Sequence, residues 1–207
     1  SVGAKCEESE DKIFYLYRIA RVYEEELRDL AAATRKLEEV LAIEPQSETA
    51  FAGLDRLLEA QGRYPELAAI LEKEIENAPV PDESLNFRYR LARLQVEHLG
   101  NSEKAVETYA ALLEDAPSHE AARQGMEELL TKGISPKRVF DVLEPLYRQD
   151  SLWENLVDIY EKYLHFVKDP EERIQLYKTI CDLQENYIQD PETAFKTWAR
   201  AFAEDES

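Results

Sequence analysis

The chain has 207 residues and a net charge of −19, from 44 acidic and 25 basic side chains. This balance argues against nucleic acid or an anionic membrane surface as a partner, because both reward clustered lysine and arginine. Six glycines and nine prolines are too few for a β-rich or disordered chain. The dominant residues favour helices, so we expect roughly three quarters helix and no sheet.

No stretch of the sequence reaches the roughly 18 apolar residues of a membrane span, and no apolar signal core follows the first residue. Cys6 and Cys181 lie far apart, so we expect neither a disulfide framework nor a thiolate metal site. These features favour a cytoplasmic protein. Because the chain begins with serine and its one methionine is Met126, we expect a processed product or an excised piece.

The N-terminal part of the sequence predicts a tail followed by a helical hairpin. Residues 1–10 are polar and acidic, which favours a tail. From Asp11, a predicted N-cap, apolar side chains recur at helical spacing to about Leu30. A second apolar stripe follows and stops at Pro45, so the first hairpin is predicted at about residues 11–46.

The same pattern of paired helices continues along the chain. Ser47 predicts an N-cap and Gly62 the turn to a partner helix, which gives a hairpin at about residues 47–80. A further hairpin at about residues 82–117 turns at Gly100.

Two of these hairpins can be superimposed by shifting the numbering by 72 without a gap. The aligned pairs include Tyr17 with Tyr89, Arg21 with Arg93, and Pro45 with Pro117. A fixed internal period is typical of a solenoid, in which each unit buries its apolar face only by stacking on the next.

Beyond residue 130 the shift changes to 89, which carries Leu67 onto Leu156 and Ala105 onto Ala194. The difference between the two shifts is 17 residues, the length of one helix and its turn. We therefore expect one inserted helix near residues 134–150. It makes the unit at about residues 118–150 an irregular joint, sharpened by Pro145, before the last unit at about 151–207.

The stretch from Gly100 to Pro117 resembles the second helix of a tetratricopeptide repeat, with a small residue at Ala105, an aromatic residue at Tyr109 and a terminal proline. Pro45 to Pro79 spans 34 residues, the length of that repeat. The resemblance covers about residues 11–204. It implies an all-α fold: a right-handed α-α superhelix of about eleven helices, forming a single domain over residues 11–207, in the manner of a long bacterial-type array.

Small and aromatic side chains take complementary places in this pattern. We expect small residues at the crossings between paired helices: Ala20, Ala92 and Cys181 in one position, and Ala33, Ala105 and Ala194 in another. We expect most large aromatic side chains to fill the core, among them Tyr23, Tyr109, Trp153 and Tyr160. Trp198 and Phe202 differ, because no helix follows them. They either pack internally or leave an apolar end face that favours another repeat or a second copy of the chain.

Catalytic and metal-binding patterns are missing from the sequence. His98, His119 and His165 have no metal-ligand spacing, and there is no GxSxG, phosphate loop or CxxC motif. We therefore expect no enzyme activity, no cofactor and no metal site.

The tetratricopeptide resemblance implies that the first helix of each pair lines a concave groove. The residues that it places there are Arg21, Arg56 and Arg93, with Tyr17 and Tyr89 one turn earlier. Arginine beside tyrosine suits carboxylates, carbonyl groups or aromatic groups of a peptide. The alternative is that the arginines pair with neighbouring carboxylates, namely Glu24, Glu25, Glu59 or Glu97.

The expected function is a non-catalytic protein–protein interaction scaffold that binds a protein or peptide partner in the groove or through its ends. One alternative is a nucleic-acid-binding helical repeat, which would need a basic groove. Another is a spacer or self-assembly segment of a longer repeat protein, associating through the C-terminal end.

Overall fold

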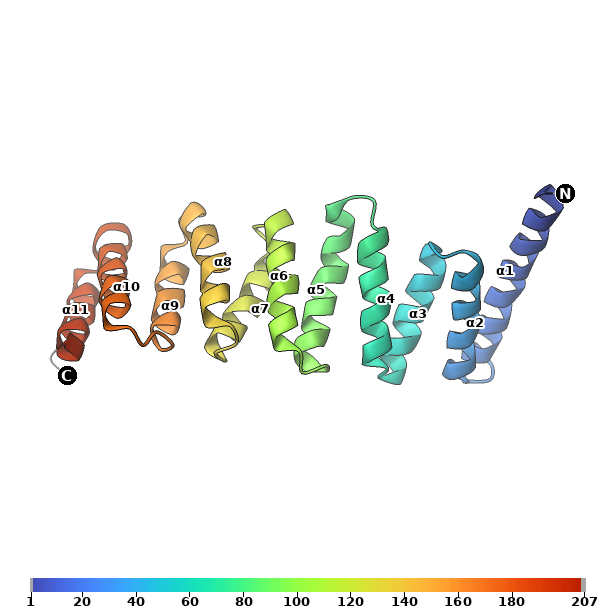
Figure 1. Cartoon of the computed structure of the whole chain (residues 1–207), viewed down its shortest axis with the longest axis horizontal. Coiled ribbons are helices and arrows are strands. Elements are labelled where there is room, and N and C mark those ends of the chain that lie inside the picture. Colours follow the sequence, from blue (N-terminus) through green and yellow to red (C-terminus); the bar gives the residue numbers. More distant parts are fainter. Residues whose placement is uncertain (1, 206–207) are drawn as a thin grey trace. The chain divides into compact units, whose positions relative to one another are not determined.

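The computed structural model describes the backbone of residues 2–205 and the side chains of residues 9–204, and this part of the chain consists of helices joined by short connections, with no strand (Figure 1). The α-helices are α1 (Val2–Glu25), α2 (Leu30–Ile43), α3 (Glu48–Gln61), α4 (Tyr64–Asn77), α5 (Pro81–Glu97), α6 (Ser102–Asp115), α7 (Glu120–Thr131), α8 (Pro136–Gln149), α9 (Trp153–Leu164), α10 (Pro170–Asp182) and α11 (Pro191–Asp205). A π-helical segment, η1 (Leu183–Ile188), continues α10. The predicted all-α, helical-hairpin fold is confirmed.

The chain divides into two compact units, Ser1–Gly100 and Asn101–Ser207. In the first unit each helix from α1 to α5 packs against its neighbour in the sequence. In the second unit α6 to α11 do the same, and α8 and α9 reach back to α6 and α7 respectively. Most apolar burial is therefore local in the sequence, as expected of stacked hairpins. A single domain over residues 11–207 stays a prediction.

The start of the first helix differs from the prediction. Helix α1 begins at Val2, so neither the tail over residues 1–10 nor the N-cap at Asp11 is correct. This segment contains no proline, and its alanine, lysine and glutamate residues have high helix propensity, so its polarity does not prevent helix formation. The side chain of Cys6 lies outside the described residues.

Small residues let consecutive helices approach closely. All six alanine and cysteine residues predicted at the helix crossings are buried. Two glycines add to this pattern. A Cβ atom on Gly53 of α3 would lie 2.6 Å from Leu37 Cδ1 of α2, and one on Gly125 of α7 would lie 2.7 Å from Tyr109 Cζ of α6. In both places a large side chain of one helix rests on a glycine 16 residues later.

The helix predicted near residues 134–150 is α8, which contacts α6, α7 and α9. Helix α8 continues through Pro145 and ends at Gln149. Its irregular backbone lies instead at its two ends, where Ser135 and Ser151 have φ angles of 43° and 57°. Such angles are uncommon for residues other than glycine, but Arg28 and Gln189 also have them, so the irregular joint stays a prediction.

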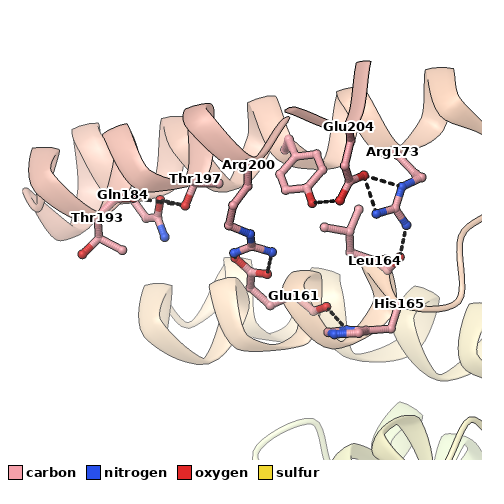
Figure 2. A network of polar contacts seen from close by, with 10 residues as sticks. Glu161, Leu164, His165, Arg173, Gln184, Thr193, Thr197, Arg200 and Glu204 are labelled. Carbon is pink, nitrogen blue, oxygen red and sulfur yellow. Dashed lines mark hydrogen bonds and ion pairs between the residues drawn. The ribbon is translucent and has the colours of Figure 1, made fainter. Parts of the chain in front are cut away.

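Ion pairs connect α9, α10 and α11 in the second unit (Figure 2). Arg200 on α11 forms two contacts with Glu161 on α9, at 3.0 and 2.8 Å. Arg173 on α10 donates to the carbonyl of Leu164 at 2.6 Å and pairs with Glu204 on α11. Because Leu164 ends α9, Arg173 satisfies a carbonyl that has no partner within its helix.

We expect Gly125→Ala to lower the free energy of unfolding by about 1–3 kcal/mol, because the new methyl group would collide with the ring of Tyr109. Gly53→Ala should cost less, since the Leu37 side chain can rotate away and alanine favours the helix by about 1 kcal/mol over glycine. Urea unfolding followed by circular dichroism measures both. A stabilised Gly125→Ala variant would contradict the close contact.

Candidate binding groove

A groove of about 920 Å³ lies in the first unit, between α3 and α5 and beside the last turn of α4. We call it the α3–α5 groove. Helix α3 contributes polar side chains together with Phe51 and Ala52; the polar ones are Glu48, Asp55, Arg56 and Glu59. The rest of the lining comes from Gln46, from Glu74 and Asn77 on α4, from Ala78 and Pro79, and from Glu83, Phe87 and Arg90 on α5.

The spacing of apolar residues explains why these side chains face the groove. On α3, Leu54, Leu57 and Leu58 are buried among the neighbouring helices. Ala52 and Arg56 are one turn apart and lie on a different face of α3. On α5, Leu91 and Leu94 are buried in the core cluster and Phe87 packs against it, while Phe87 and Arg90 also line the groove.

Each of the three predicted groove arginines is held by a carboxylate. Arg56 lines the groove and forms two hydrogen bonds with Glu24 of α1, one of them 2.8 Å long. Arg21 lies 2.9 Å from Glu25, and Arg93 lies 2.6 Å from Glu97. The alternative interpretation, in which the arginines pair with neighbouring carboxylates, therefore describes all three.

The two predicted groove tyrosines are half-buried and do not line the α3–α5 groove. The hydroxyl of Tyr17 is hydrogen-bonded to the hydroxyl of Ser47 at 2.9 Å, and the ring packs against the core. Tyr17 therefore has a structural role in holding α1 next to the start of α3. A binding role for Tyr17 or Tyr89 stays a prediction.

Arg90 is the groove arginine that the sequence analysis missed. Its guanidinium contacts both oxygens of Asp55, one at 2.8 Å, and lies 3.4 Å from Glu59. The 34-residue spacing of the prolines carries Arg56 onto Arg90, whereas Arg93 lies three residues further along α5. The 34-residue repeat length therefore predicts Arg90 as the equivalent of Arg56 in the next repeat.

Glu74 carries an unsatisfied carboxylate oxygen beside the groove. Its Oε2 atom is buried and has no hydrogen-bond partner. Burial, and then the negative charge of Asp55, raise the pKa of this carboxyl to about 7, while the positive charge of Arg90 opposes the shift. Glu74 therefore changes its charge near neutral pH.

The groove as a whole is negatively charged. Five carboxylates line it, against the two guanidiniums of Arg56 and Arg90, which are already paired. Glu48, Glu74 and Glu83 form no ion pair with any described residue. Beside them Phe87 and Pro79 supply an apolar wall. This arrangement suits a cationic group attached to an apolar one.

The C-terminal face of α11 is apolar and exposed. Trp198 is 42% exposed and Phe202 66%, and Phe195, at 74%, lies on the same face. Of the two alternatives for Trp198 and Phe202, the structure shows the exposed apolar face and not internal packing. A role of this face in binding stays a prediction.

Cys181 has a packing role. It is fully buried, and its thiol lies 3.7 Å from the carbonyl oxygen of Ala194. Burial raises the pKa of the thiol to about 11, which keeps it protonated at neutral pH.

In the described part of the chain, no cluster of three or more His, Cys, Asp or Glu side chains is arranged to hold a metal ion. None of the described helices combines the length and the apolar character needed to cross a bilayer.

Comparison with known families agrees with the stacked hairpins. The family model described as Tetratricopeptide repeat matches residues 15–47, in α1 and α2, and residues 88–119, from α5 to the end of α6. Together with the helical-hairpin architecture, these matches support a helical repeat protein that contains tetratricopeptide-like repeats in these two segments.

Several solved structures are similar at low sequence identity. A tetratricopeptide repeat protein from Parabacteroides merdae is 18% identical, with 93% of this chain and 80% of that chain covered and a TM-score of 0.42. MamA from Desulfovibrio magneticus RS-1 is 17% identical, with 95% and 96% covered and a TM-score of 0.41. BtubC (BKLC) from P. vanneervenii is 17% identical, with 94% and 90% covered and a TM-score of 0.35. No curated protein matches the chain.

We expect Glu74→Gln to stabilise the protein more at about pH 8.5 than at about pH 5.5. The pKa in the folded state, about 7, lies above the ordinary value of 4.5, so the folded protein favours the protonated carboxyl. Stability is therefore lost progressively as the pH rises from about 4.5 to about 7, and glutamine removes that loss. Because the side chain is only half-buried, solvent screening limits the gain to about 1 kcal/mol.

Urea unfolding at the two pH values measures this difference. Glu76→Gln on the same helix is the matched control, since Glu76 is exposed and should change stability by less than about 0.5 kcal/mol at either pH. Equal effects of Glu74→Gln at both pH values would show that Glu74 titrates normally.

Proposed function

We propose that this chain is a non-catalytic protein-interaction scaffold whose α3–α5 groove binds a segment of a partner protein that carries lysine or arginine beside an apolar side chain. The observation that carries this proposal is the unpaired, half-buried carboxylate of Glu74 beside the groove. Because Glu74 lines the groove, a cation bound there would offset the cost of its poorly solvated negative charge.

The charges around Glu74 favour a cationic partner over an anionic one. Glu48 and Glu83 line the same groove and extend the negative potential along α3 and α5. An anionic partner would first have to displace Glu24 from Arg56, or Asp55 from Arg90. The net charge of −19 adds long-range attraction for basic segments and repels nucleic acid.

The apolar wall gives the partner a second anchor. Phe87 is half-buried at the groove, and Pro79 is exposed next to it. An aliphatic or aromatic side chain of the bound segment would cover this surface, and burial of a side chain of that size supports binding. Recognition would combine this contact with an ion pair to Glu74, which fixes the position of the segment.

The two tetratricopeptide repeat matches support a scaffold role in general terms. Helix α4 packs against both α3 and α5, so the groove is formed by the packing of three consecutive helices. A preformed groove of this kind lowers the cost of ordering the protein on binding.

Fluorescence anisotropy with two short labelled peptides tests the proposal, one alternating leucine with lysine and the other alternating leucine with glutamate. We expect the lysine peptide to bind and the glutamate peptide not to bind. The affinity for the lysine peptide should rise between about pH 6 and pH 8, because Glu74 loses its proton in that range. Double substitution Glu74→Gln and Glu83→Gln should weaken binding by at least about fivefold.

A control of equal charge separates groove binding from general attraction to an acidic protein. Glu26→Gln with Glu76→Gln removes the same two charges from exposed positions outside the groove. Equal loss of affinity in both double variants, or no binding of the lysine peptide, would contradict the proposed site.

A further inference from the structure

The shift of 89 carries an aromatic stack of the first unit onto an aromatic stack of the second. Tyr64 at the start of α4 stacks on His98 at the end of α5, with ring centroids 3.8 Å apart. Their copies are Trp153 at the start of α9 and Tyr187 in η1, with ring centroids 4.4 Å apart. Each unit therefore contains the same ring contact between the start of one helix and the end of the next.

The backbone around the two stacks has the same conformation. Gly62 and Gly100 of the first unit have φ angles of 66° and 62°. The residues 89 positions later, Ser151 and Gln189, have φ angles of 57° and 62°. Left-handed turns therefore stand at equivalent positions before and after both ring pairs, and the two places differ in their side chains.

The side chains around the two stacks differ in charge. In the first unit Arg63 precedes the tyrosine and pairs with Glu66 at 2.7 Å. The shift replaces Arg63 by Leu152 and Pro65 by Glu154. Glu154 forms no ion pair with any described residue. The stack of the second unit thus lacks the cation of the first and has an unpaired carboxylate beside it.

The stack of the second unit borders a surface cavity of about 320 Å³, which we call the Trp153–Tyr187 site. Leu152 and Ile188 supply apolar edges of the cavity, and Glu154 supplies a charged one. Tyr187 is 49% exposed and Trp153 is half-buried, so a side chain that enters the cavity can reach the rings.

This exposure is a property of the stack and does not depend on the last helix of the sequence. In the first unit His98 is also exposed, although α6 to α11 follow it in the chain. In the second unit α10 and α11 follow Trp153 and leave the cavity open.

The two chain segments that carry the rings are acidic. Residues 149–161 and 179–195 contain eight carboxylates and no lysine or arginine. Four of the carboxylates pair with cations from other positions, namely Asp150, Asp158, Glu161 and Glu192. Glu154 and Glu185 have no ion-pair partner among the side chains that the structure describes. The local charge therefore attracts a cation and repels phosphate and carboxylate groups.

The ring geometry selects among cations. Centroids 4.4 Å apart, with ring planes tilted by 42°, leave no space for a cation between the two rings. A cation must therefore lie on the outer face of one ring. The flat guanidinium of arginine can stack on such a face and still donate to a carboxylate at its edge. A lysine ammonium is a compact, more strongly hydrated point charge and gains less from the same place.

We propose that the Trp153–Tyr187 site binds an arginine side chain of a partner protein, with the guanidinium stacked on the exposed ring of Tyr187 and hydrogen-bonded to Glu154. Leu152 and Ile188 contact the apolar side chains next to that arginine. The site lies in the second unit and is built from other residues than the α3–α5 groove, so either site can fail without the other.

An NMR titration of isotope-labelled protein tests the proposal, because the indole N–H of Trp153 reports on the site itself. The ligands are capped Leu-Arg-Leu, Leu-Lys-Leu and Leu-citrulline-Leu, since citrulline keeps the planar shape of arginine without its charge. We expect the Trp153 resonance to shift and saturate in the millimolar range with the arginine peptide. The lysine peptide should bind at least about threefold more weakly, and the citrulline peptide should not bind.

Trp198 supplies an internal control for this titration. Its indole is exposed but lies outside the site, so its resonance should shift less than that of Trp153. The spectrum of Trp198→Phe assigns the two indole resonances.

Matched variants test the two contacts separately. Glu154→Gln should weaken binding of the arginine peptide by at least about threefold. Glu171→Gln removes the same charge from the first turn of α10, at an exposed position outside the site, and should leave the affinity unchanged. Tyr187→Leu keeps an apolar side chain without the ring and should also weaken binding by at least about threefold. Circular dichroism checks that the variants are folded.

Four results would overturn the proposal. An unmoved Trp153 resonance would show that the site is not occupied, and equal affinity for the arginine and citrulline peptides would show that it does not recognise a cation. Equal affinity for the arginine and lysine peptides would indicate attraction to negative charge without stacking. Equal effects of Glu154→Gln and Glu171→Gln would show that binding depends on the overall charge of the protein.

Discussion

The structure depends on the close approach of consecutive helices at positions that only small side chains can occupy. Leu37 rests on Gly53 and Tyr109 rests on Gly125, and the alanines predicted at helix crossings are buried. Each helix has only its near neighbours in the sequence to cover its apolar stripe, so a large side chain at one crossing would separate two helices along their length. Because the same contact recurs at a fixed period, one local solution is repeated to build each unit.

This packing also determines what the groove can bind. On α5, Leu91 and Leu94 are buried in the core cluster, and Phe87 and Arg90 beside them line the groove; on α3, Leu54 and Leu58 are buried, and Asp55 and Arg56 line it. Polar residues gather on those faces, and the arginines among them are neutralised by carboxylates of the same or the preceding first helix. What remains is the charge of carboxylates that lack a partner, of which Glu74 is the most deeply buried. An abundance of acidic residues thus converts an arginine-bearing face into an acidic one.

The sequence was sufficient for the parts of the fold that repeat. The shifts of 72 and 89 located the hairpins and the inserted helix α8, because a conserved spacing of small and apolar residues survives substitution of the residues between them. The sequence was insufficient where a property of a residue, such as its pKa, depends on side chains from several helices. The pKa of Glu74 reflects burial by its surroundings and the charges of Asp55 and Arg90 on two other helices, which no local pattern reveals. The helical start of α1 was missed because polar residues of high helix propensity resemble a tail in composition.

The central claim is that one helix places a large side chain on a glycine of the next, and nuclear Overhauser effects on glycine-labelled protein test it most directly. The account predicts cross-peaks between the Hα atoms of Gly125 and the ring of Tyr109, with ring-current shifts of those Hα resonances, and cross-peaks between Gly53 and the methyl groups of Leu37. Absence of both sets of cross-peaks in the folded protein, with glycine resonances at random-coil positions, would contradict it.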